Sequence, residues 1–362
     1  MIYAYNVSLP GAYHVKNKIP NQDYCEVKKC NDVLAFAAVA DGLGSAEHSD
    51  VASKIAVEES ISHCIENITL SMHSEELLSV VKKSFLRALN EIEKKAKLEN
   101  HDITSYDTTL SFAVLMKDRL FYGHSGDSGI VALTTKGQYK KVTEQQRDEN
   151  GCVFPLFFKE KWIFGEFDEK VCSLFLATDG MLETLFPFYI RNEEVSIYVT
   201  LAEFFMDNRR LQIEKRGELA VKEEIEKFIF NIPEEQVNDD KTVVVLINTS
   251  IKPKLMHADY YKEPDWVALK QKHDEEWKRQ AYPHLYVDSD IEKKEDSIAT
   301  ETKYTSNQEN NSCETKRESL SSIAEKSKSL LENVRTKGID LVNKGIDGAE
   351  KVIDIISGDE DK

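Results

Sequence analysis

Four aspartates stand where short apolar runs of the chain begin or end, and this arrangement limits the fold more than any other feature. Asp41 follows the run VLAFAAVA and Asp179 follows LFLAT, and a glycine comes directly after each. Asp23, in NQDYC, stands at the mouth of the first long predicted strand, and Asp239 shortly precedes the β-branched run TVVVLI. Carboxylates at strand ends, beside glycines that allow close approach, are what a cluster of hard divalent cations requires. The chain must therefore fold so that distant strand ends meet.

Short runs rich in valine, alanine, phenylalanine and leucine alternate with longer amphipathic segments through about residue 251. The short runs predict strands at 23–26, 33–40, 110–116, 120–124, 130–133, 171–177 and 242–247. The longer segments predict one helix that begins at Ser49 or Asp50, either of which suits the N-cap, and further helices at 75–97, 195–206 and 218–230. Long helices among irregularly spaced strands favour an α+β fold over a βαβ series. We expect two packed antiparallel β-sheets flanked by helices.

The composition divides the chain into three parts. Residues 1–250 hold the alternating pattern and predict one globular domain. Residues 251–287 predict a helical extension, because four large side chains recur there at helical spacing and would face the main domain or a partner. They are Trp266, Leu269, His273 and Trp277.

Residues 288–362 are charged and rich in serine, which predicts a disordered linker. The segment ends in a sequence that repeats KGID and places isoleucines at heptad-like spacing. Two interpretations remain open. The repeat forms a short amphipathic helix that docks on a partner protein or a membrane surface, or it is a frayed, solvated tail.

The formal net charge of −17 argues against nucleic acid as a partner, because phosphates are repelled by an acidic surface. The apolar runs are shorter than the roughly 20 residues needed to cross a bilayer, and the N-terminus lacks the basic-then-apolar pattern of a secretory signal. We therefore expect a cytoplasmic protein without a transmembrane segment. The six cysteines show no CxxC or paired spacing, so we expect neither a zinc site nor a disulfide framework.

An Asp-Gly pair after a strand is often only a turn, so one such pair is a weak signal. Two copies of the pattern are harder to explain by turns alone. Gly42 would let a backbone carbonyl reach the same ion as Asp41. In NDDKTVVV, either Asp239 or Asp240 stands at the strand entrance, and a simple polar turn explains this pair equally well.

Six segments, taken in order, resemble the metal-dependent protein phosphatase 2C family, particularly its compact bacterial members. They span roughly residues 8–248 and read GAYHVKNKIPNQD, ADGLGSAEHSDVASKIAVE, DTTLSFAVL, LFYGHSGDSGIVAL, LATDGMLETL and NDDKTVVVL. The resemblance implies a β-sandwich flanked by helices, with two Mn²⁺ or Mg²⁺ ions at one edge.

The resemblance also assigns ligands, position by position. Asp41 would bridge both ions, and the carbonyl of Gly42 would bind one of them. Asp127 matches the acid that helps to hold a third, weaker ion in several members. Three further acids would complete the coordination shells, partly through water: Asp23, Asp179 and Asp239.

The chemistry of these side chains agrees with that assignment. Oxygen ligands without a cysteine or histidine cluster select Mg²⁺ or Mn²⁺ over zinc. Two such ions roughly 3.5–4 Å apart can share one water, lower its pKa toward neutrality and direct the hydroxide at phosphorus. No phosphoenzyme is then required, and the sequence carries no GxSxG elbow, Walker loop or Cys-x5-Arg signature.

Three positions depart from the family pattern. Lys18, with Lys16 nearby, stands where members usually have an arginine that grips the phosphate, so a bidentate contact is lost. Leu43 stands where some relatives place a histidine as general acid. His14 is then a candidate for proton transfer, although a lone histidine is more often structural. The segment after Lys141 lacks the Asp-His that often follows threonine in the family.

Residues 144–169 are the expected substrate-facing flap. The flap is rich in aromatic side chains, which either cover a bound peptide or pack internally. They are Phe154, Phe157, Phe158, Trp162 and Phe164.

The first functional hypothesis is a Mn²⁺- or Mg²⁺-dependent phosphatase that acts on phosphoserine and phosphothreonine in proteins and opposes a kinase in a bacterial signalling system. Asp41, Lys18 and His14 are its candidate catalytic residues. The second hypothesis is a phosphatase-shaped scaffold without turnover, which the retention of all four acids disfavours. The third keeps the chemistry and changes the substrate to a small phosphorylated metabolite.

Overall fold

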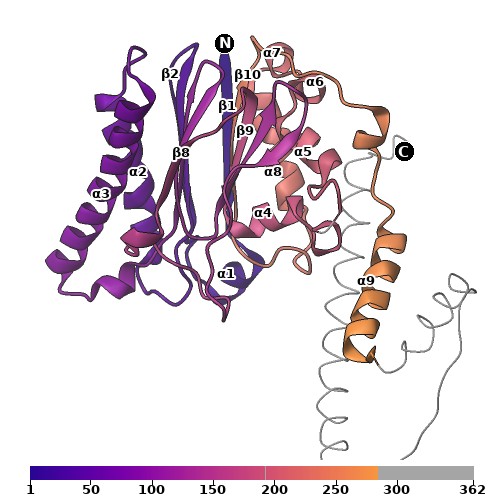
Figure 1. Ribbon diagram of the computed structural model, residues 1–362. Helices are drawn as coiled ribbons and strands as arrows, with labels where there is room; N and C mark the ends of the chain where they lie inside the picture. The colour runs from indigo at the N-terminus through magenta and orange to yellow at the C-terminus, as the bar shows by residue number, and fades with distance from the viewer. Residues whose placement is uncertain (192, 284–362) are drawn as a thin grey trace, which may run out of the picture. The chain divides into compact units, whose positions relative to one another are not determined.

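The computed structural model describes residues 1–191 and 193–283 (Figure 1). The linker and the C-terminal amphipathic helix predicted within 288–362 lie outside these residues. In the described part of the chain, no helix is both long enough and apolar enough to cross a membrane.

Ten strands of the described residues form two five-stranded antiparallel sheets. The first sheet has the order β1 (Ile2–Leu9), β10 (Lys241–Asn248), β9 (Val171–Ala177), β6 (Gly129–Thr134) and β7 (Tyr139–Lys141). The second has the order β2 (Tyr24–Asn31), β3 (Leu34–Ala40), β4 (Leu110–Met116), β5 (Arg119–Ser125) and β8 (Ile163–Glu166). Together with the flanking helices, these sheets confirm the predicted α+β fold.

Seven of these strands correspond to predicted ones, and β4 and β9 have the predicted bounds. The sequence patterns do not predict β1, β7 or β8. Strand β1 carries Asn6 and Ser8 where an apolar run would continue, and β7 and β8 are only 3 and 4 residues long. These three strands form because each finds a partner strand, β10, β6 and β5 respectively.

The core between the sheets consists of alternate residues of the facing strands. From β3, Ala35, Ala37 and Val39 point into this layer, and Phe36 and Ala38 pack on the other side, under the helices. Both faces of the strand are therefore covered, which explains why the run LAFAAVA is apolar throughout and fully buried. The first sheet contributes larger side chains to the same layer: Ile130, Leu174, Leu176, Val244 and Leu246.

Helices cover the outer faces of the two sheets (Figure 1). The long helices α2 (Ser49–Asn67) and α3 (Ser74–Glu99) pack on the second sheet in one apolar cluster. On the other side, α4 (Asp179–Leu185), α5 (Val199–Met206) and α8 (Glu218–Phe230) flank the first sheet. The shorter helices are α1 (Ala12–Asn17), α6 (Asn208–Leu211), α7 (Ile213–Arg216), η1 (Ile103–Tyr106), η2 (Lys159–Lys161), η3 (Phe188–Ile190) and η4 (Ala258–Tyr261).

The predicted N-cap of α2 and the predicted start of α5 are wrong. Helix α2 begins at Ser49, as predicted, but its N-cap is His48, and the buried hydroxyl of Ser49 makes no cap hydrogen bond. Helix α5 starts at Val199 and not at residue 195. The backbone N–H of Tyr198 donates to the carbonyl of Leu185, at 2.8 Å, which keeps the preceding residues out of the helix.

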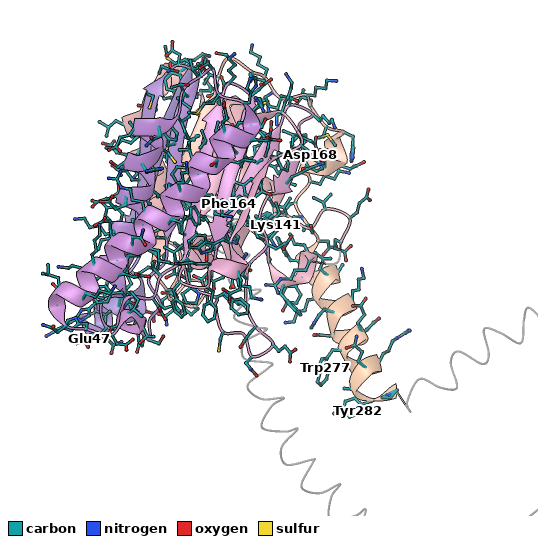
Figure 2. The ribbon with its side chains drawn as sticks, turned by 60° about the vertical axis from the view of Figure 1, so that its left-hand side comes forward. Glu47, Lys141, Phe164, Asp168, Trp277 and Tyr282 are labelled. Carbon is teal, nitrogen blue, oxygen red and sulfur yellow. The ribbon has the colours of Figure 1, made fainter. Side chains whose placement is uncertain are left out.

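Residues Met1–Pro264 fall in one compact unit. In this unit the ring of Tyr260 stacks on that of Tyr139, and the Tyr260 hydroxyl accepts a hydrogen bond of 2.9 Å from the Tyr139 backbone N–H. The segment just after residue 250 therefore packs with the sheets. Helix α9 (Trp266–Ala281) belongs to a second unit and forms where the helical extension is predicted; its Trp277 ring lies 6.2 Å from that of Tyr282 (Figure 2).

Candidate metal centre

The antiparallel pairing brings the predicted strand ends to one edge of the sandwich. Tyr24 at the start of β2 pairs with Ala40 at the end of β3, so Asp23 and Asp41 lie side by side. In the other sheet, Ala177 at the end of β9 pairs with both the start of β10 and the start of β6. The same edge thus receives three more acids from the adjoining turns: Asp127, Asp179 and Asp239.

Three carboxylates meet at this edge. Oxygens of Asp41, Asp127 and Asp179 all lie within 4.8 Å of one another. Asp127 comes from the turn in which the chain passes from β5 in one sheet to β6 in the other, and Asp179 is the first residue of α4. We refer to these three residues as the carboxylate cluster.

The backbone of Asp41 is fixed to the start of β4. Its N–H donates to the hydroxyl of Thr109 at 2.9 Å, and its carbonyl accepts from the Thr108 hydroxyl at 2.9 Å. The next residue must be glycine for a steric reason, because a Cβ on Gly42 would lie 2.6 Å from the carbonyl oxygen of Ser49. The Asp-Gly signal therefore reports a tightly packed turn as well as a carboxylate at a strand end.

Asp23 is buried beside the cluster and lies outside it. The hydroxyl of Thr178 donates to its Oδ2 at 2.8 Å. Burial raises the pKa of Asp23 well above its ordinary value, and the neighbouring charge of Asp240 raises it further. The sequence did not predict Thr178 as a site residue, because a threonine at the end of a strand carries no distinctive signal.

The cluster concentrates negative charge. Burial raises the pKa of Asp41 well above its ordinary value, and the carboxylates of Asp23 and Asp179 raise it further. Burial also raises the pKa of Asp179 to about 7, and Asp127 and Asp239 add to the shift. Like charges at this spacing disfavour ionisation of the whole group unless a cation joins them.

The donor set fits a divalent cation of the Mg²⁺ or Mn²⁺ type. All three side chains of the cluster offer oxygen, which such ions prefer. Asp127 is 1% exposed, and its Oδ1 is buried without a hydrogen-bond partner. A buried carboxylate oxygen without a partner is costly, and a bound cation removes that cost.

A second group, His14, Asp239 and Asp240, lies beside the cluster. Asp240 is buried, and its oxygens accept hydrogen bonds from His14 Nδ1 at 2.8 Å and from the backbone N–H groups of Gly11 and Gln22 at 2.7 Å each. Asp240 therefore joins His14 to the backbone at Gly11 and Gln22. Asp239 is exposed, and its charge reaches the cluster, where it raises the pKa of Asp41 and Asp179.

The family model for protein phosphatase 2C matches residues 10–227, which is more than half of the chain. The chain belongs to the protein phosphatase 2C family. It is a phosphoprotein phosphatase with the sandwich, the strand-end acids and the flanking helices described above. A search of curated proteins found no match.

Three solved structures are similar to this phosphatase. The serine/threonine phosphatase Stp1 from Staphylococcus aureus is 13% identical, with 68% of this chain and 95% of that chain covered and a TM-score of 0.48. The Mycobacterium tuberculosis serine/threonine phosphatase PstP/Ppp is 16% identical, with 68% and 98% covered and a TM-score of 0.46. The catalytic domain of PstP in complex with two manganese ions is 18% identical, with 68% and 97% covered and a TM-score of 0.47.

Sequence reasoning missed Arg147, which contacts the cluster directly. Its Nη2 lies 2.7 Å from Asp127 Oδ2 and 3.0 Å from Asp179 Oδ2, and its Nε donates to the same oxygen of Asp127 at 3.0 Å. The only available signal was a single arginine in the segment that departs from the family pattern. Nothing in its local sequence indicates which acids it meets.

The flap residues divide into two sets. Trp162 and Phe164 pack against the apolar cluster under α3, edge-on to Phe85 with ring centroids 5.6 and 5.0 Å away (Figure 2 labels Phe164). Phe157 and Phe158 stack on each other, and Phe154 meets Phe158 edge-on. Internal packing therefore accounts for the first pair.

Lys18 lies at the C-terminal end of α1, exposed and in the left-handed conformation with φ 55°. His14, on the same helix, is 6% exposed and bonded to Asp240. The catalytic roles predicted for both residues stay predictions, as do the roles of individual metal ligands.

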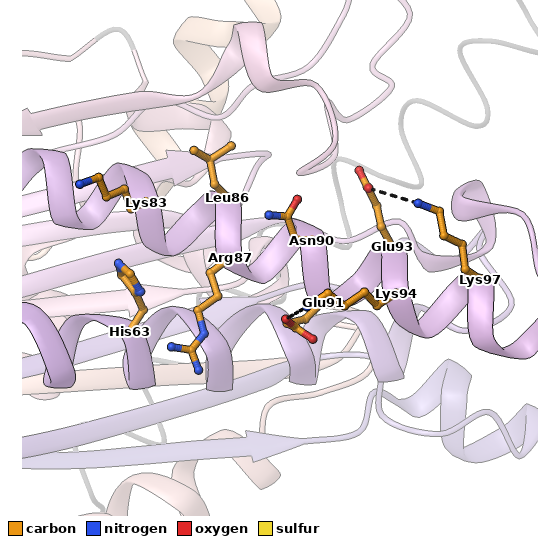
Figure 3. A pocket seen from close by; sticks show the side chains of 9 residues that line it. All are labelled: His63, Lys83, Leu86, Arg87, Asn90, Glu91, Glu93, Lys94 and Lys97. Carbon is orange, nitrogen blue, oxygen red and sulfur yellow. Dashed lines mark hydrogen bonds and ion pairs between the residues drawn. The ribbon is translucent and has the colours of Figure 1, made fainter.

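A cavity of about 510 Å³ lies between α2 and α3 (Figure 3). Its lining is charged, and several of those charges are paired: Arg87 contacts Glu59 and Glu66, and Lys94 contacts Glu91. No residue of the carboxylate cluster lines it. It is a polar groove between two helices.

Proposed function

We propose that this chain is a metal-dependent serine/threonine protein phosphatase that hydrolyses phosphoserine and phosphothreonine and opposes a kinase in bacterial signalling. The observation that carries the proposal is the meeting of three carboxylates within 4.8 Å at the edge where the two sheets end. We further propose that it acts in the cytoplasm on phosphorylated proteins.

In this proposal Asp41 would be shared by the two Mn²⁺ or Mg²⁺ ions, the Gly42 carbonyl would bind one of them, and Asp23, Asp179 and Asp239 would complete the ligand set. Ions of this kind lower the pKa of water and offset the negative charge on the phosphoryl oxygens. The protein contributes rigidity: the hydroxyls of Thr108 and Thr178 donate to Asp41 and Asp23, and the Asp41 backbone N–H donates to the Thr109 hydroxyl. Preorganised ligands of this kind need little rearrangement when the substrate arrives.

We propose further roles for two basic residues of α1 and its C-terminal end. Lys18 is exposed at the C-terminal end of α1 and would attract the substrate phosphate as a point charge. His14 holds Asp240, which accepts the backbone N–H of Gln22 next to Asp23, so it positions the ligand loop; we keep it as the candidate proton donor for the leaving alkoxide. Hydrolysis forms one bond from water oxygen to phosphorus and breaks the bond from phosphorus to the serine or threonine oxygen.

A metal-dependence assay on phosphorylated peptides tests the proposal. Purified protein is expected to release phosphate from phosphoserine and phosphothreonine peptides with Mn²⁺ or Mg²⁺, and EDTA is expected to abolish this. Turnover without metal would contradict the mechanism. Hydrolysis of small phosphate esters but not of peptides would favour the metabolite phosphatase, and no turnover on any phosphate ester would favour the scaffold.

A further inference from the structure

Arg147 forms the most direct contact between a basic side chain and the carboxylate cluster. Its guanidinium reaches Asp127 Oδ2 at 2.7 Å and Asp179 Oδ2 at 3.0 Å, and Glu183 Oε1 lies 3.6 Å away. One positive charge therefore stands along the edge of the cluster that joins Asp127 to Asp179. An ion that joined these same two oxygens would take the place of the guanidinium.

The main chain fixes this position. The backbone N–H of Gln146 donates to the Gly126 carbonyl at 2.8 Å, and the Gly126 N–H donates to the Gln146 side chain at 3.0 Å. The side-chain amide of Gln145 donates to the Asp127 carbonyl at 3.0 Å. Arg147 thus follows a segment that is fastened to the turn of Asp127 itself, so its contact is part of the fold.

The guanidinium leaves part of the cluster open. Asp127 Oδ1 is buried without a hydrogen-bond partner among the described residues. Among the contacts that the described residues make, those of Arg147 involve Asp127 and Asp179 but not Asp41. The charge of Arg147 is therefore confined to one side of the cluster.

We propose that Arg147 is a built-in cation that occupies the Asp127–Asp179 edge of the cluster and excludes a divalent ion from that edge. An ion bound to the same oxygens would have to share the space of the guanidinium, and at a separation of about 4 Å the repulsion of the two charges is large in a partly buried site. The divalent ions are left to the side of the cluster that Asp41 faces. This inference rests on the proposed function, because it takes the cluster to bind divalent ions.

The test counts bound ions and does not depend on turnover. The full chain is dialysed to equilibrium against Mn²⁺, and manganese per chain is measured by elemental analysis. Arg147→Gln is expected to bind one ion more than the unmodified protein. The extra ion is expected to disappear in Arg147→Gln/Asp127→Asn, which locates it at this edge.

Arg87→Gln is the matched control. Arg87 is 35% exposed against 36% for Arg147, and it also contacts two carboxylates, Glu59 and Glu66, which lie outside the cluster (Figure 3 shows Arg87). The Arg87→Gln variant is expected to bind the same number of ions as the unmodified protein. A gain of one ion here would overturn the proposal, because the gain would then report a general change of charge.

Asp127→Asn alone keeps the proposal testable if Arg147→Gln does not fold. Because Arg147 already holds Asp127, this variant is expected to bind as many ions as the unmodified protein. Loss of one ion would overturn the proposal. Two bound ions in both the unmodified protein and Arg147→Gln would also overturn the role proposed for Arg147, but would leave the proposed metal centre standing. No bound ion in either protein would overturn both the role of Arg147 and the metal centre.

Discussion

Two buried aspartates of this phosphatase each pair with a more exposed arginine, in different surroundings. In the pair Asp207–Arg209, both carboxylate oxygens accept hydrogen bonds, from Arg209 and from the hydroxyl of Tyr139 at 2.9 Å. In the pair Asp127–Arg147, one oxygen accepts from the guanidinium and the other has no partner. We call the first the closed pair and the second the open pair.

The difference separates a pair that is bonded only within the fold from a pair that belongs to a group of acids. The closed pair ties the start of α6 to β7, and no further carboxylate meets it in a ligand-like group of the described residues. The open pair belongs to the carboxylate cluster, where negative charge exceeds the single positive charge of Arg147. The closed pair has both oxygens of its carboxylate bonded within the fold, whereas the open pair lies beside other acids and keeps one oxygen without a partner.

The largest expected effect is on turnover. Asp41→Asn or Asp179→Asn is expected to abolish metal-dependent hydrolysis of phosphopeptides, because each removes a ligand charge from the cluster. Neither change is expected to lower the melting temperature of the metal-free protein, since each relieves repulsion among like charges. Enzyme assays measure the turnover, and thermal unfolding measures the melting temperature. Full activity in both variants would show that the cluster around the open pair is not needed for hydrolysis.

The next effect is on stability. Arg209→Gln leaves Asp207 as a buried charge without its cation and is expected to lower the free energy of unfolding by about 3–5 kcal/mol. Mn²⁺ is expected to leave that loss unchanged. In Arg147→Gln, Mn²⁺ is expected to restore most of the free energy of unfolding that this substitution removes, because an ion takes the place of the guanidinium. Denaturant unfolding with and without Mn²⁺ compares the variants, and equal behaviour would show that the two pairs do not differ in kind.

The third expected effect is a dependence of stability on pH, caused by His124, which anchors the start of the flap. The Nε2 of His124 donates to the Glu144 carbonyl at 2.9 Å, and its Nδ1 accepts from the Ser111 hydroxyl at 2.9 Å, so a neutral imidazole anchors the segment that leads to Arg147. Burial lowers the pKa of His124 to about 4. The unfolded chain therefore binds more protons between pH 6.5 and 4, and stability is lost as pH falls through that window.

The loss attributable to His124 is about 3 kcal/mol over the full window. His124→Gln is expected to flatten the dependence of the unfolding free energy on pH in this range, although it lowers stability at neutral pH. Denaturant unfolding from pH 4 to pH 7 measures the slope. An unchanged slope in the variant would remove His124 as the cause.

The smallest effect concerns the closed pair. Tyr260→Phe removes the acceptor for the Tyr139 backbone N–H, and Tyr139 in turn donates to Asp207. The expected loss is about 1 kcal/mol with unchanged turnover per folded molecule. A change in Mn²⁺ binding in this variant would show that the two pairs communicate. Equal stability would show that the contact after residue 250 contributes nothing.

Local sequence predicted much of the scaffold because the relevant signals are local. A strand buried on both faces must be apolar at every position, as in β3, β4 and β9, and these strands match their predicted ranges closely. The acids at strand ends were equally visible, because a charge that interrupts such a run marks its end. Helices with one apolar stripe, such as α3 and α8, were predicted for the same reason.

The sequence by itself determined which residues end the strands and which acids stand there, because side-chain periodicity records which face of each element is buried. Only the tertiary structure decided the contacts between distant segments: the pairing of β1 with β10, the burial of Asp240 under Gly11 and Gln22, and the approach of Arg147 to Asp127. A side chain in a loop carries no periodic signal of its partner. Its place depends on how the two sheets pack and where the turn between β5 and β6 crosses from one sheet to the other.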